Sequence, residues 1–246
     1  TEITVREGYG QTETTLQIGT FPGIKVKLGS MGKEAPGFNI EILDNENRKL
    51  GTGEEGIIAV KVKPTKPEGL MEGYLDPFEK NFEVFVGQWY LTGDMDFKDE
   101  DGYFWFIGRV DDVFKSSDYR ISPFVLESEL PKHPAVVEAA VVSSPDKIRG
   151  FIPKAYIVLK KDYAADYDTA FKMFKFIRDN IAPYKRPRII EFVTELPKTI
   201  SGKIKRNELR EKEKELRGSN QRKENEYFEE DFRENFDKDN IIGQNF

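Results

Sequence analysis

The chain has 246 residues, 38% of them hydrophobic and 13% aromatic, which is enough for one large or two modest domains with packed cores. The net charge of −6 gives no support for a nucleic-acid partner, and the absence of cysteine excludes disulfides, thiolate metal sites and a cysteine nucleophile. The single histidine, His133, argues against a histidine metal site or a Ser-His-Asp triad.

The first predicted element is a short strand at residues 3–6, which runs directly into Gly8-Tyr9-Gly10-Gln11-Thr12-Glu13. Two glycines around an aromatic residue let the backbone turn and approach a flat ligand, and the polar residues that follow offer hydrogen-bonding groups. An ordinary glycine turn has the same composition. Composition alone favours the simple turn, and it is the exact order YGQTE that favours a ligand site.

Residues 16–107 are predicted to form short strands separated by turns, because apolar residues alternate between clusters of Gly, Asn and Asp. The strands are predicted at residues 38–43, 57–62, 89–94 and 103–107. A short helix is expected from Asp76-Pro77 through Val86. Together these elements predict a distorted β-barrel or curled sheet with the aromatic side chains in its core.

The pattern changes beyond residue 109. A short helix is expected at 123–130, and apolar residues at helical spacing predict a longer one that Asp168-Thr169 caps and Pro183 stops. Strands are predicted at 136–142, 152–159 and 189–193, and a charged helix begins at Asn207. Interleaved strands and helices indicate a compact α+β domain of about 100 residues.

We therefore predict a mixed α+β protein in three parts. Residues 1–109 form the strand-rich part with the distorted β-barrel subdomain, and residues 110–210 form a small α+β domain with a central sheet and flanking helices. Residues 211–246 form a charged helical or disordered tail, in which no period persists after Arg217. The alternative is that the tail docks a partner through Tyr227, Phe228, Phe232 and Phe236.

Four motifs occur in order: YGQTET at 9–14, YLTGD at 90–94, GRVDD at 108–112 and PKTISGKIKR at 197–206. Their order and spacing resemble the motifs of the AMP-forming acyl-CoA synthetases of the adenylate-forming superfamily. The segments GSMGKEAPGF, HPAVVEAAVVSSPD and APYKRPR are most similar to the medium-chain branch. The resemblance implies an acid–thiol ligase that activates a carboxylic acid with ATP and Mg²⁺ and passes the acyl group from an acyl-adenylate to coenzyme A, releasing AMP and pyrophosphate.

The resemblance implies roles for the first motif. Tyr9 stacks on adenine, and Gly10 and Gln11 line the same nucleotide site. Thr12 binds the α-phosphate, and Glu13 helps to bind Mg²⁺, a hard cation that prefers oxygen ligands. Thr12 and Glu13 thereby also count as catalytic residues.

Further nucleotide contacts are implied downstream. Asp94 accepts hydrogen bonds from both ribose hydroxyls, Arg109 contacts the ribose, and Arg120 contacts the phosphate side of the adenylate. Lys203 lies in a loop between Pro and Gly and supplies positive charge to the adenylating step, where a preorganised donor contributes roughly 3 to 4 kcal/mol. The plainer interpretations are a core-edge aromatic for Tyr9, a turn cap for Asp94 and a surface ion pair for Arg109.

The second half-reaction brings in coenzyme A. The resemblance implies that the small domain rotates between the two steps about a hinge at Asp111. Coenzyme A passes Ser117 and Asp118 and meets Arg178, for which an exposed helix charge is the alternative. The family has glycine where this chain has Asp118, so the aspartate either obstructs the narrow passage or points away from it.

The chain also departs from the family in what is missing. The Ser/Thr/Gly-rich triphosphate loop and most of the acyl pocket lie upstream of YGQTE in these proteins and do not occur here. We therefore expect the chain to be inactive alone and to act with the missing upstream region. A non-catalytic nucleotide-binding remnant and another adenylate-forming enzyme, such as a carrier-protein adenylating domain, are the alternatives.

The sequence gives limited information on location. No stretch approaches the roughly 20 apolar residues of a membrane span, and no basic-then-apolar signal pattern occurs at the start. The lack of cysteine fits a reducing compartment, so a cytoplasmic location is expected. Because Thr1 is not an initiator methionine, the true amino-terminus is expected to be absent, which leaves a targeting segment open.

Overall fold

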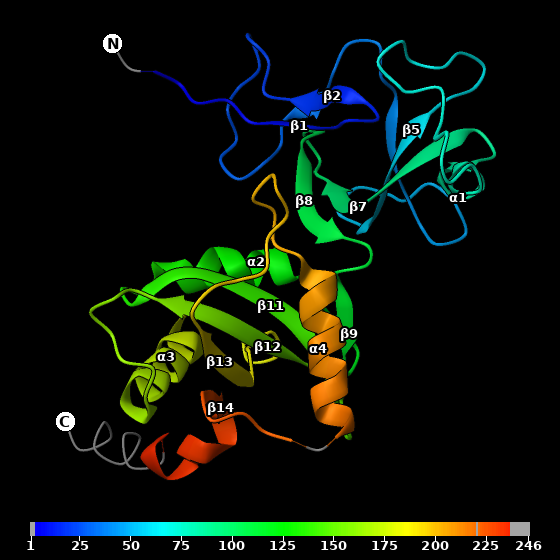
Figure 1. Ribbon diagram of the computed structural model, residues 1–246. Helices are drawn as coiled ribbons and strands as arrows, with labels where there is room; N and C mark the ends of the chain where they lie inside the picture. Colours follow the sequence, from blue (N-terminus) through cyan, green and yellow to red (C-terminus); the bar gives the residue numbers. More distant parts are fainter. Residues whose placement is uncertain (1–2, 220, 237–246) are drawn as a thin grey trace. The chain divides into compact units, whose positions relative to one another are not determined.

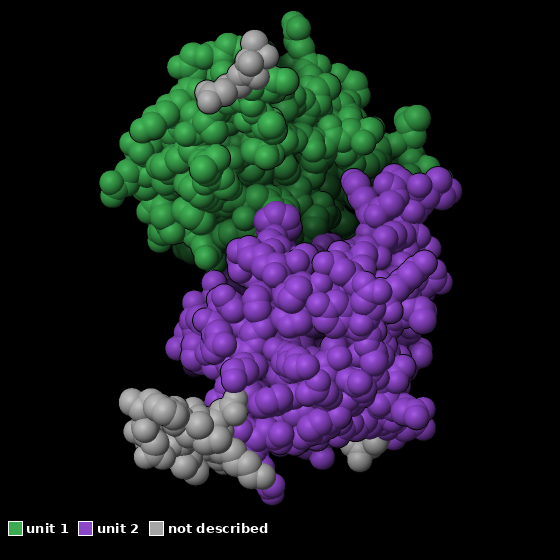
Figure 2. All heavy atoms as spheres, turned by 90° about the vertical axis from the view of Figure 1, so that its left-hand side faces the viewer, with its two compact units in different colours: residues 1–111 green, residues 112–246 purple. Residues whose placement is uncertain are grey.

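The computed structural model describes residues 3–219 and 221–236. The chain divides into two compact units, and unit 1 ends at Asp111 while unit 2 begins at Asp112. Figure 2 shows unit 1 in green and unit 2 in purple. The compact units divide two residues after the domain boundary predicted between residues 109 and 110. That boundary between functional domains stays a prediction.

Unit 1 contains two open antiparallel sheets (Figure 1). The smaller sheet consists of β1 (Gly8–Gln11), β2 (Thr15–Gly19) and β3 (Lys33–Glu34). The larger sheet has the order β4 (Ile40–Leu43), β5 (Gly56–Lys61), β7 (Trp89–Lys98) and β6 (Phe85–Val86), and β8 (Phe104–Arg109) also pairs with β7. The expected distorted barrel thus takes the form of two sheets that do not close.

The long strand β7 organises the larger sheet of unit 1. It pairs with β5, β6 and β8, and its register shifts between Met95 and Asp96 opposite β8. Such irregularities bend a strand and increase its twist. The helix expected at 76–86 is shorter, α1 (Lys80–Val84), because Phe85 is extended and pairs with Tyr90 of β7.

Unit 2 is built on a four-stranded sheet in the order β11 (Val136–Asp146), β12 (Gly150–Leu159), β13 (Ile189–Val193) and β14 (Glu226–Phe228). Strands β12 and β13 are parallel and are joined through α3 (Tyr167–Asn180), and the other pairs are antiparallel. The cap of helix α3 lies two residues before the predicted one, because the Asp166 carboxylate accepts a hydrogen bond from the Thr169 amide at 2.9 Å. The remaining elements are β9 (Phe114–Ser116), β10 (Tyr119–Ile121), α2 (Pro123–Glu129), α4 (Arg206–Gly218) and the 3-10 helices Leu130–Lys132 and Glu229–Phe232.

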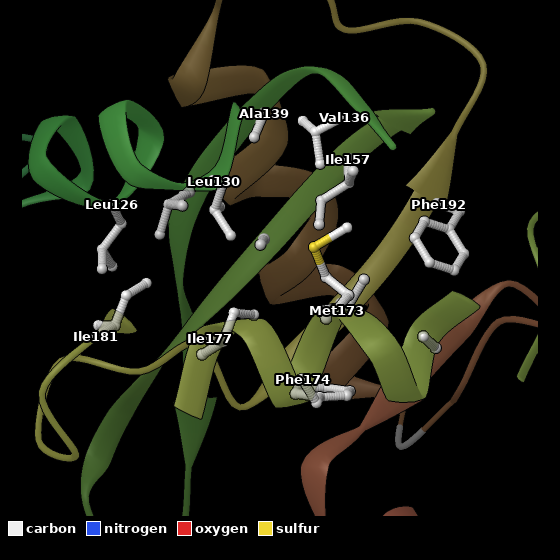
Figure 3. Close-up of a cluster of buried hydrophobic side chains, with 14 of the residues drawn as sticks. Leu126, Leu130, Val136, Ala139, Ile157, Met173, Phe174, Ile177, Ile181 and Phe192 are labelled. Atoms are coloured by element: carbon white, nitrogen blue, oxygen red, sulfur yellow. The ribbon is translucent and has the colours of Figure 1, made fainter. Parts of the chain in front are cut away.

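Alternation along β11 and β12 directs apolar side chains to both faces of the sheet. Figure 3 shows one face, where Met173, Phe174 and Ile177 of α3 gather with Leu126 and Leu130 against the sheet. On the other face, Leu209 of α4 packs with side chains of the two strands. The α+β class of the sequence prediction is confirmed, and the sheet is buried on both faces.

Within the predicted charged helical or disordered tail, residues 211–218 belong to helix α4, and the described residues after it pack on the rest of unit 2 as far as Phe236. Strand β14 extends the sheet, and Phe232 and Phe236 are buried against α3. The Phe232 ring centre lies 5.9 Å from that of Phe171 and 5.4 Å from that of Phe174. These aromatic side chains are too widely spaced to form a local period, so the sequence pattern did not predict that they would be buried. Residues 220 and 237–246 of the predicted tail lie outside the described residues.

Candidate functional site

Four predicted nucleotide residues of unit 1 come together around the Asp94 carboxylate, which is 5% exposed. Its Oδ2 accepts hydrogen bonds from Tyr9 Oη at 2.5 Å and from Gln11 Nε2 at 2.7 Å. Its Oδ1 faces Arg109 Nη1 at 3.3 Å. The buried Asp94 carboxylate and its polar partners therefore come from three strands, β1, β7 and β8.

Strand geometry explains why these side chains meet. Residues two apart on a strand face the same side, and along β1 Tyr9 and Gln11 are partly buried while Gly8 and Gly10 are exposed. Asp94 of β7 and Arg109 of β8 are direct partners in the register of the sheet. Gly10 is required by close approach, since a Cβ there would lie 1.9 Å from the Thr15 carbonyl oxygen.

Gly93 lets the Arg109 guanidinium lie across the strand. Its φ is +73°, a conformation that favours glycine, and a Cβ at this position would lie 3.1 Å from Arg109 Nη2. The neighbouring Thr92 carbonyl accepts from Gln11 Nε2 at 2.9 Å and from Arg109 Nη1 at 3.4 Å. The Asp94 carboxylate and the Thr92 carbonyl thus hold the side chains of Gln11 and Arg109 in place.

Burial and charge act in opposite directions in this group. Burial raises the pKa of Asp94, while the donors Tyr9, Arg109 and Gln11 favour the carboxylate form and offset part of that rise. Burial and the nearby Asp94 charge raise the pKa of Tyr9 far above its ordinary value, so its hydroxyl remains a donor. Burial opposes the charge of Arg109, but Asp94 and Asp111 outweigh it and raise its pKa.

The sequence prediction missed three residues that form hydrogen bonds with predicted site residues. Tyr90 Oη donates to Gln11 Oε1 at 3.1 Å, and Thr92 supplies the carbonyl acceptor described above. Both lie at two-residue steps before Asp94, so strand alternation within YLTGD is the signal that marks them. Tyr74 Oη donates to Glu13 Oε1 at 2.7 Å across 61 positions, and no local pattern indicates that pair.

Thr12 and Glu13 lie in the turn that joins β1 to β2. Thr12 is exposed, and Glu13 is half-buried beside Tyr74. A carboxylate is a ligand type that Mg²⁺ accepts, since this ion binds through one or two carboxylates together with waters and phosphates. The role of Glu13 in binding Mg²⁺ stays a prediction.

A second acidic group lies inside unit 2. Glu191, Glu213 and Glu226 are the acidic side chains that approach one another closely enough to hold a metal ion among residues 3–219 and 221–236. The Lys154 ammonium already lies between them, at 2.6, 2.6 and 2.5 Å from one oxygen of each. A buried cation of the protein itself fills this position, so the cluster is structural.

In unit 2, Ser117 and Asp118 form the two-residue turn between β9 and β10, and Arg120 follows on β10. All three are exposed. The left-handed residue of the turn is Ser117, with φ +54°, and Asp118 is not among the positive-φ residues of the described chain. The backbone at Asp118 therefore accepts a side chain, although the family has glycine there.

Lys203 is exposed in a tight turn before α4. The turn closes through hydrogen bonds from the Thr199 amide to the Lys203 carbonyl at 2.8 Å and from the Gly202 amide to the Thr199 carbonyl at 2.9 Å. Arg206 anchors its base, because Nε donates to Glu127 Oε1 at 2.9 Å. The lysine thus projects from a rigid turn on the surface of unit 2.

Arg178 and Asp111 have partners of their own. Arg178, in the last turn of α3, has its Cζ 4.0 Å from the centre of the Phe236 ring and its Nη1 3.7 Å from Glu229 Oε1. Asp111 is exposed, with Oδ1 3.7 Å from Arg109 Nη2. Four of the predicted residues therefore form one cluster in unit 1, while those of unit 2 lie on two turns, strand β10 and one helix end.

The chain is similar to known proteins along most of its length. Residues 1–75 match the family described as AMP-binding enzyme, and residues 125–203 match the AMP-binding enzyme C-terminal domain. The chain is 54% identical over 215 residues to mitochondrial acyl-coenzyme A synthetase ACSM3 of Rattus norvegicus, covering 87% of this chain and 37% of that relative. It is 52% identical over 226 residues to 4-hydroxybutyrate–CoA ligase 1 of Metallosphaera sedula, covering 92% and 40%. The chain thus spans about two fifths of the length of these relatives.

Solved structures show the same fold. The anthranilate CoA ligase AuaEII in complex with anthranoyl-AMP matches 87% of this chain and 40% of its own, with a TM-score of 0.77 and 39% identity. ATP-bound MatB from Rhodopseudomonas palustris matches 86% and 41%, with a TM-score of 0.75 and 29% identity. Within the described residues no helix is long and apolar enough to cross a membrane. The cytoplasmic location stays a prediction, since the ACSM3 relative is mitochondrial.

Proposed function

Because the chain belongs to the family of AMP-binding enzymes, we propose that it supplies the adenosine site and the mobile small domain of an AMP-forming acid–thiol ligase. In the first step a carboxylate oxygen attacks the α-phosphorus of ATP and the bond to pyrophosphate breaks. In the second step the thiol of coenzyme A attacks the acyl carbonyl, loses its proton and releases AMP. The similarity of GSMGKEAPGF, HPAVVEAAVVSSPD and APYKRPR to the medium-chain branch supports a medium-chain carboxylic acid as substrate.

The observation that carries this proposal is the group around Asp94. Asp94 is a buried carboxylate fixed by Tyr9, Gln11 and Arg109, so its orientation is set before a ligand arrives. A carboxylate with two oxygens suits a ribose that presents two neighbouring hydroxyls. In the proposed complex the Tyr9 ring lies against adenine and Arg109 contacts the ribose. Preorganised groups of this kind stabilise a reacting complex without reorganising during the reaction.

The phosphate side of the proposed site involves both units. Thr12 donates to the α-phosphate, Glu13 holds Mg²⁺ together with the phosphates, and Arg120 and Lys203 contribute positive charge during adenylation. Mg²⁺ supplies neutralisation of the phosphate charge when it is bound. The exposure of Lys203 on a closed turn suits a charge that a rotating domain presents and withdraws.

The thioester-forming step uses other residues of the small domain. We place the rotation at Asp111, next to the division between the compact units, and the passage of coenzyme A at Ser117 and Asp118. Arg178 meets a phosphate group of coenzyme A. The tolerant backbone at Asp118 supports the interpretation that its side chain leaves this passage open.

Isothermal titration of the chain with AMP tests the adenosine site. Asp94→Asn should weaken AMP binding by about 1.5 to 3 kcal/mol, which is the range for a hydrogen bond to a charged group. Asp96→Asn is the matched control, because Asp96 is a buried aspartate two residues along β7 whose Oδ1 accepts from the Trp105 amide. It should leave AMP affinity unchanged.

The ligand itself provides the second half of this test. AMP without its 2′- and 3′-hydroxyls should bind the native chain more weakly than AMP does and should bind Asp94→Asn with no further loss. Equal affinity of the native chain for both ligands would show that Asp94 does not bind the ribose.

A further inference from the structure

A basic hollow of about 440 Å³ lies in unit 2, and none of the residues proposed to contact adenosine in unit 1 lines it. Its lining includes five arginines: Arg149, Arg178, Arg186, Arg188 and Arg233. Three carboxylates, including that of Glu229, also line it. Positive charge is therefore in excess, and the hollow suits a ligand with more than one negative charge.

Glu229 reaches two of these arginines. Its Oε2 accepts from Arg188 Nη1, and its Oε1 lies 3.7 Å from Arg178 Nη1. Its side chain is only 13% exposed. The Glu229 amide also donates to the Arg188 carbonyl at 2.9 Å, which holds the residue in place.

The positive charges of neighbouring arginines repel one another, and the carboxylate of Glu229 reduces this repulsion. Burial and the positive charge of Arg178 lower the pKa of Arg186, and Glu229 acts in the opposite direction. Arg186 is held there by hydrogen bonds from its guanidinium to the Ile181 carbonyl at 2.7 Å and to the Arg178 carbonyl at 2.5 Å. Since these groups are fixed, an anion has to compete with Glu229 for Arg178 and Arg188.

We propose that Glu229 is an internal competitor that occupies Arg178 and Arg188 in the hollow, so that a phosphate-bearing ligand binds only by displacing its carboxylate. The inference rests on the proposed function only in taking Arg178 as a phosphate contact. Glu229 itself lies beyond residue 203, where the match to the family's C-terminal domain ends. The segment that begins with β14 therefore regulates the affinity of a hollow that it lines together with earlier parts of unit 2.

Titration of the full chain with inorganic pyrophosphate at low salt tests this proposal. Glu229→Gln should bind pyrophosphate about tenfold more tightly than the native chain, a change that corresponds to 1.4 kcal/mol. Glu230→Gln is the matched control, because it removes the same charge from the lining of the same hollow, where Glu230 is more exposed than Glu229. It should change the affinity by less than about twofold, since partly exposed charges are screened. Arg178→Gln in the Glu229→Gln background should abolish the gain.

Several outcomes would overturn the proposal. Unchanged or weaker pyrophosphate binding by Glu229→Gln would contradict the proposed competition. Equal gains in affinity for Glu229→Gln and Glu230→Gln would mean that the gain comes from net charge and not from the position of Glu229. Glu229→Asp, which keeps the charge but shortens the side chain, should give an intermediate gain and serves if the glutamine variant has a lowered melting temperature. Pyrophosphate has no ribose, so its binding can be interpreted even if Asp94 proves not to bind the ribose of AMP.

Discussion

Asp94 and Asp96 lie two residues apart on β7, yet their carboxylates have different surroundings. Asp94 faces three donors, one of them the Arg109 guanidinium. Asp96 is fully buried and accepts from the Trp105 amide at 2.8 Å, while its Oδ2 has no hydrogen-bond partner among the described residues. Burial raises the pKa of Asp96 to about 8. Burial thus raises the pKa of both carboxyl groups, but at Asp94 a guanidinium and two side-chain donors offset part of the rise.

The Asp96 pKa predicts how the stability of unit 1 changes with pH. Between the unfolded value of 3.8 and the folded value of about 8, only the folded state keeps the proton, so stability falls as pH rises. The contribution is about 1 kcal/mol per pH unit. Asp96→Asn should remove it, because the amide cannot ionise.

Denaturant titrations between pH 5 and pH 8 measure this effect. Both tryptophans, Trp89 and Trp105, lie in unit 1, so their fluorescence follows that unit. If the native chain and Asp96→Asn keep the same slope of stability against pH, Asp96 is not the titrating group.

At the scale of elements, the β9–β10 turn shows that the departure from the family pattern falls on a position without backbone strain. Ser117, not Asp118, has the left-handed conformation. A residue other than glycine in that conformation costs roughly 1 to 2 kcal/mol. A glycine also makes the unfolded chain more flexible, at a cost of roughly 0.5 to 1 kcal/mol.

The two substitutions of this turn should therefore have opposite effects. Ser117→Gly relieves the left-handed strain and should stabilise unit 2 by about 0.5 to 1 kcal/mol, whereas Asp118→Gly only adds flexibility and should destabilise it by a similar amount. Urea unfolding followed by far-ultraviolet circular dichroism measures both. Stabilisation by Asp118→Gly would mean that the aspartate strains the turn.

Strand β14 is attached to the sheet through a buried charge cluster. Lys154 contacts Glu191, Glu213 and Glu226 from β12, β13, α4 and β14, and Arg217 Nε lies 2.7 Å from Glu213 Oε1. The burial of these charges is offset because each carboxylate has a cation. Removal of the central cation leaves buried negative charges without their partner.

Lys154→Met should therefore destabilise unit 2 by about 3 to 5 kcal/mol. Lys223→Met provides the comparison, since Lys223 pairs with Glu191 at 2.6 Å but is 47% exposed, and its loss should cost less than about 1 kcal/mol. Denaturant unfolding of both variants gives the two values. Similar losses would indicate that the cluster contributes through its surface pairs.

At the scale of the whole molecule, each unit has its own hydrophobic core. Ile58 and Phe104 are fully buried in unit 1, and Phe174 and Phe232 are fully buried in unit 2. The two clusters share no residue among those described. Separate cores predict that the units lose structure in separate transitions.

Phe174→Ala and Ile58→Ala test this independence. Each should lower the stability of its own unit by about 2 to 5 kcal/mol through the cavity that it leaves. Amide hydrogen exchange should show the loss of protection for Phe174→Ala only in unit 2 and for Ile58→Ala only in unit 1. A loss that spreads to both units for either variant would show a single cooperative unit.

The fold was predictable where the pattern is local. Alternation predicted most strands, and apolar spacing predicted α3 around Phe174, because periods of two and 3.6 follow directly from strand and helix geometry. The boundaries were less accurate: Asp166 caps α3 two residues early, and Phe85 leaves the expected helix for β7. Those outcomes depend on which backbone partner is available, which a local pattern does not contain.

The sequence alone determined the pattern of strands and turns and the family to which the order of its motifs belongs. Only the tertiary structure decided that Tyr9 donates to Asp94 across 85 positions, that Tyr74 meets Glu13, and that Glu229 enters a basic hollow. The physical reason is that buried polar groups require partners, and those partners are set by the packing of distant elements. Local sequence specifies the elements, and burial selects the pairs.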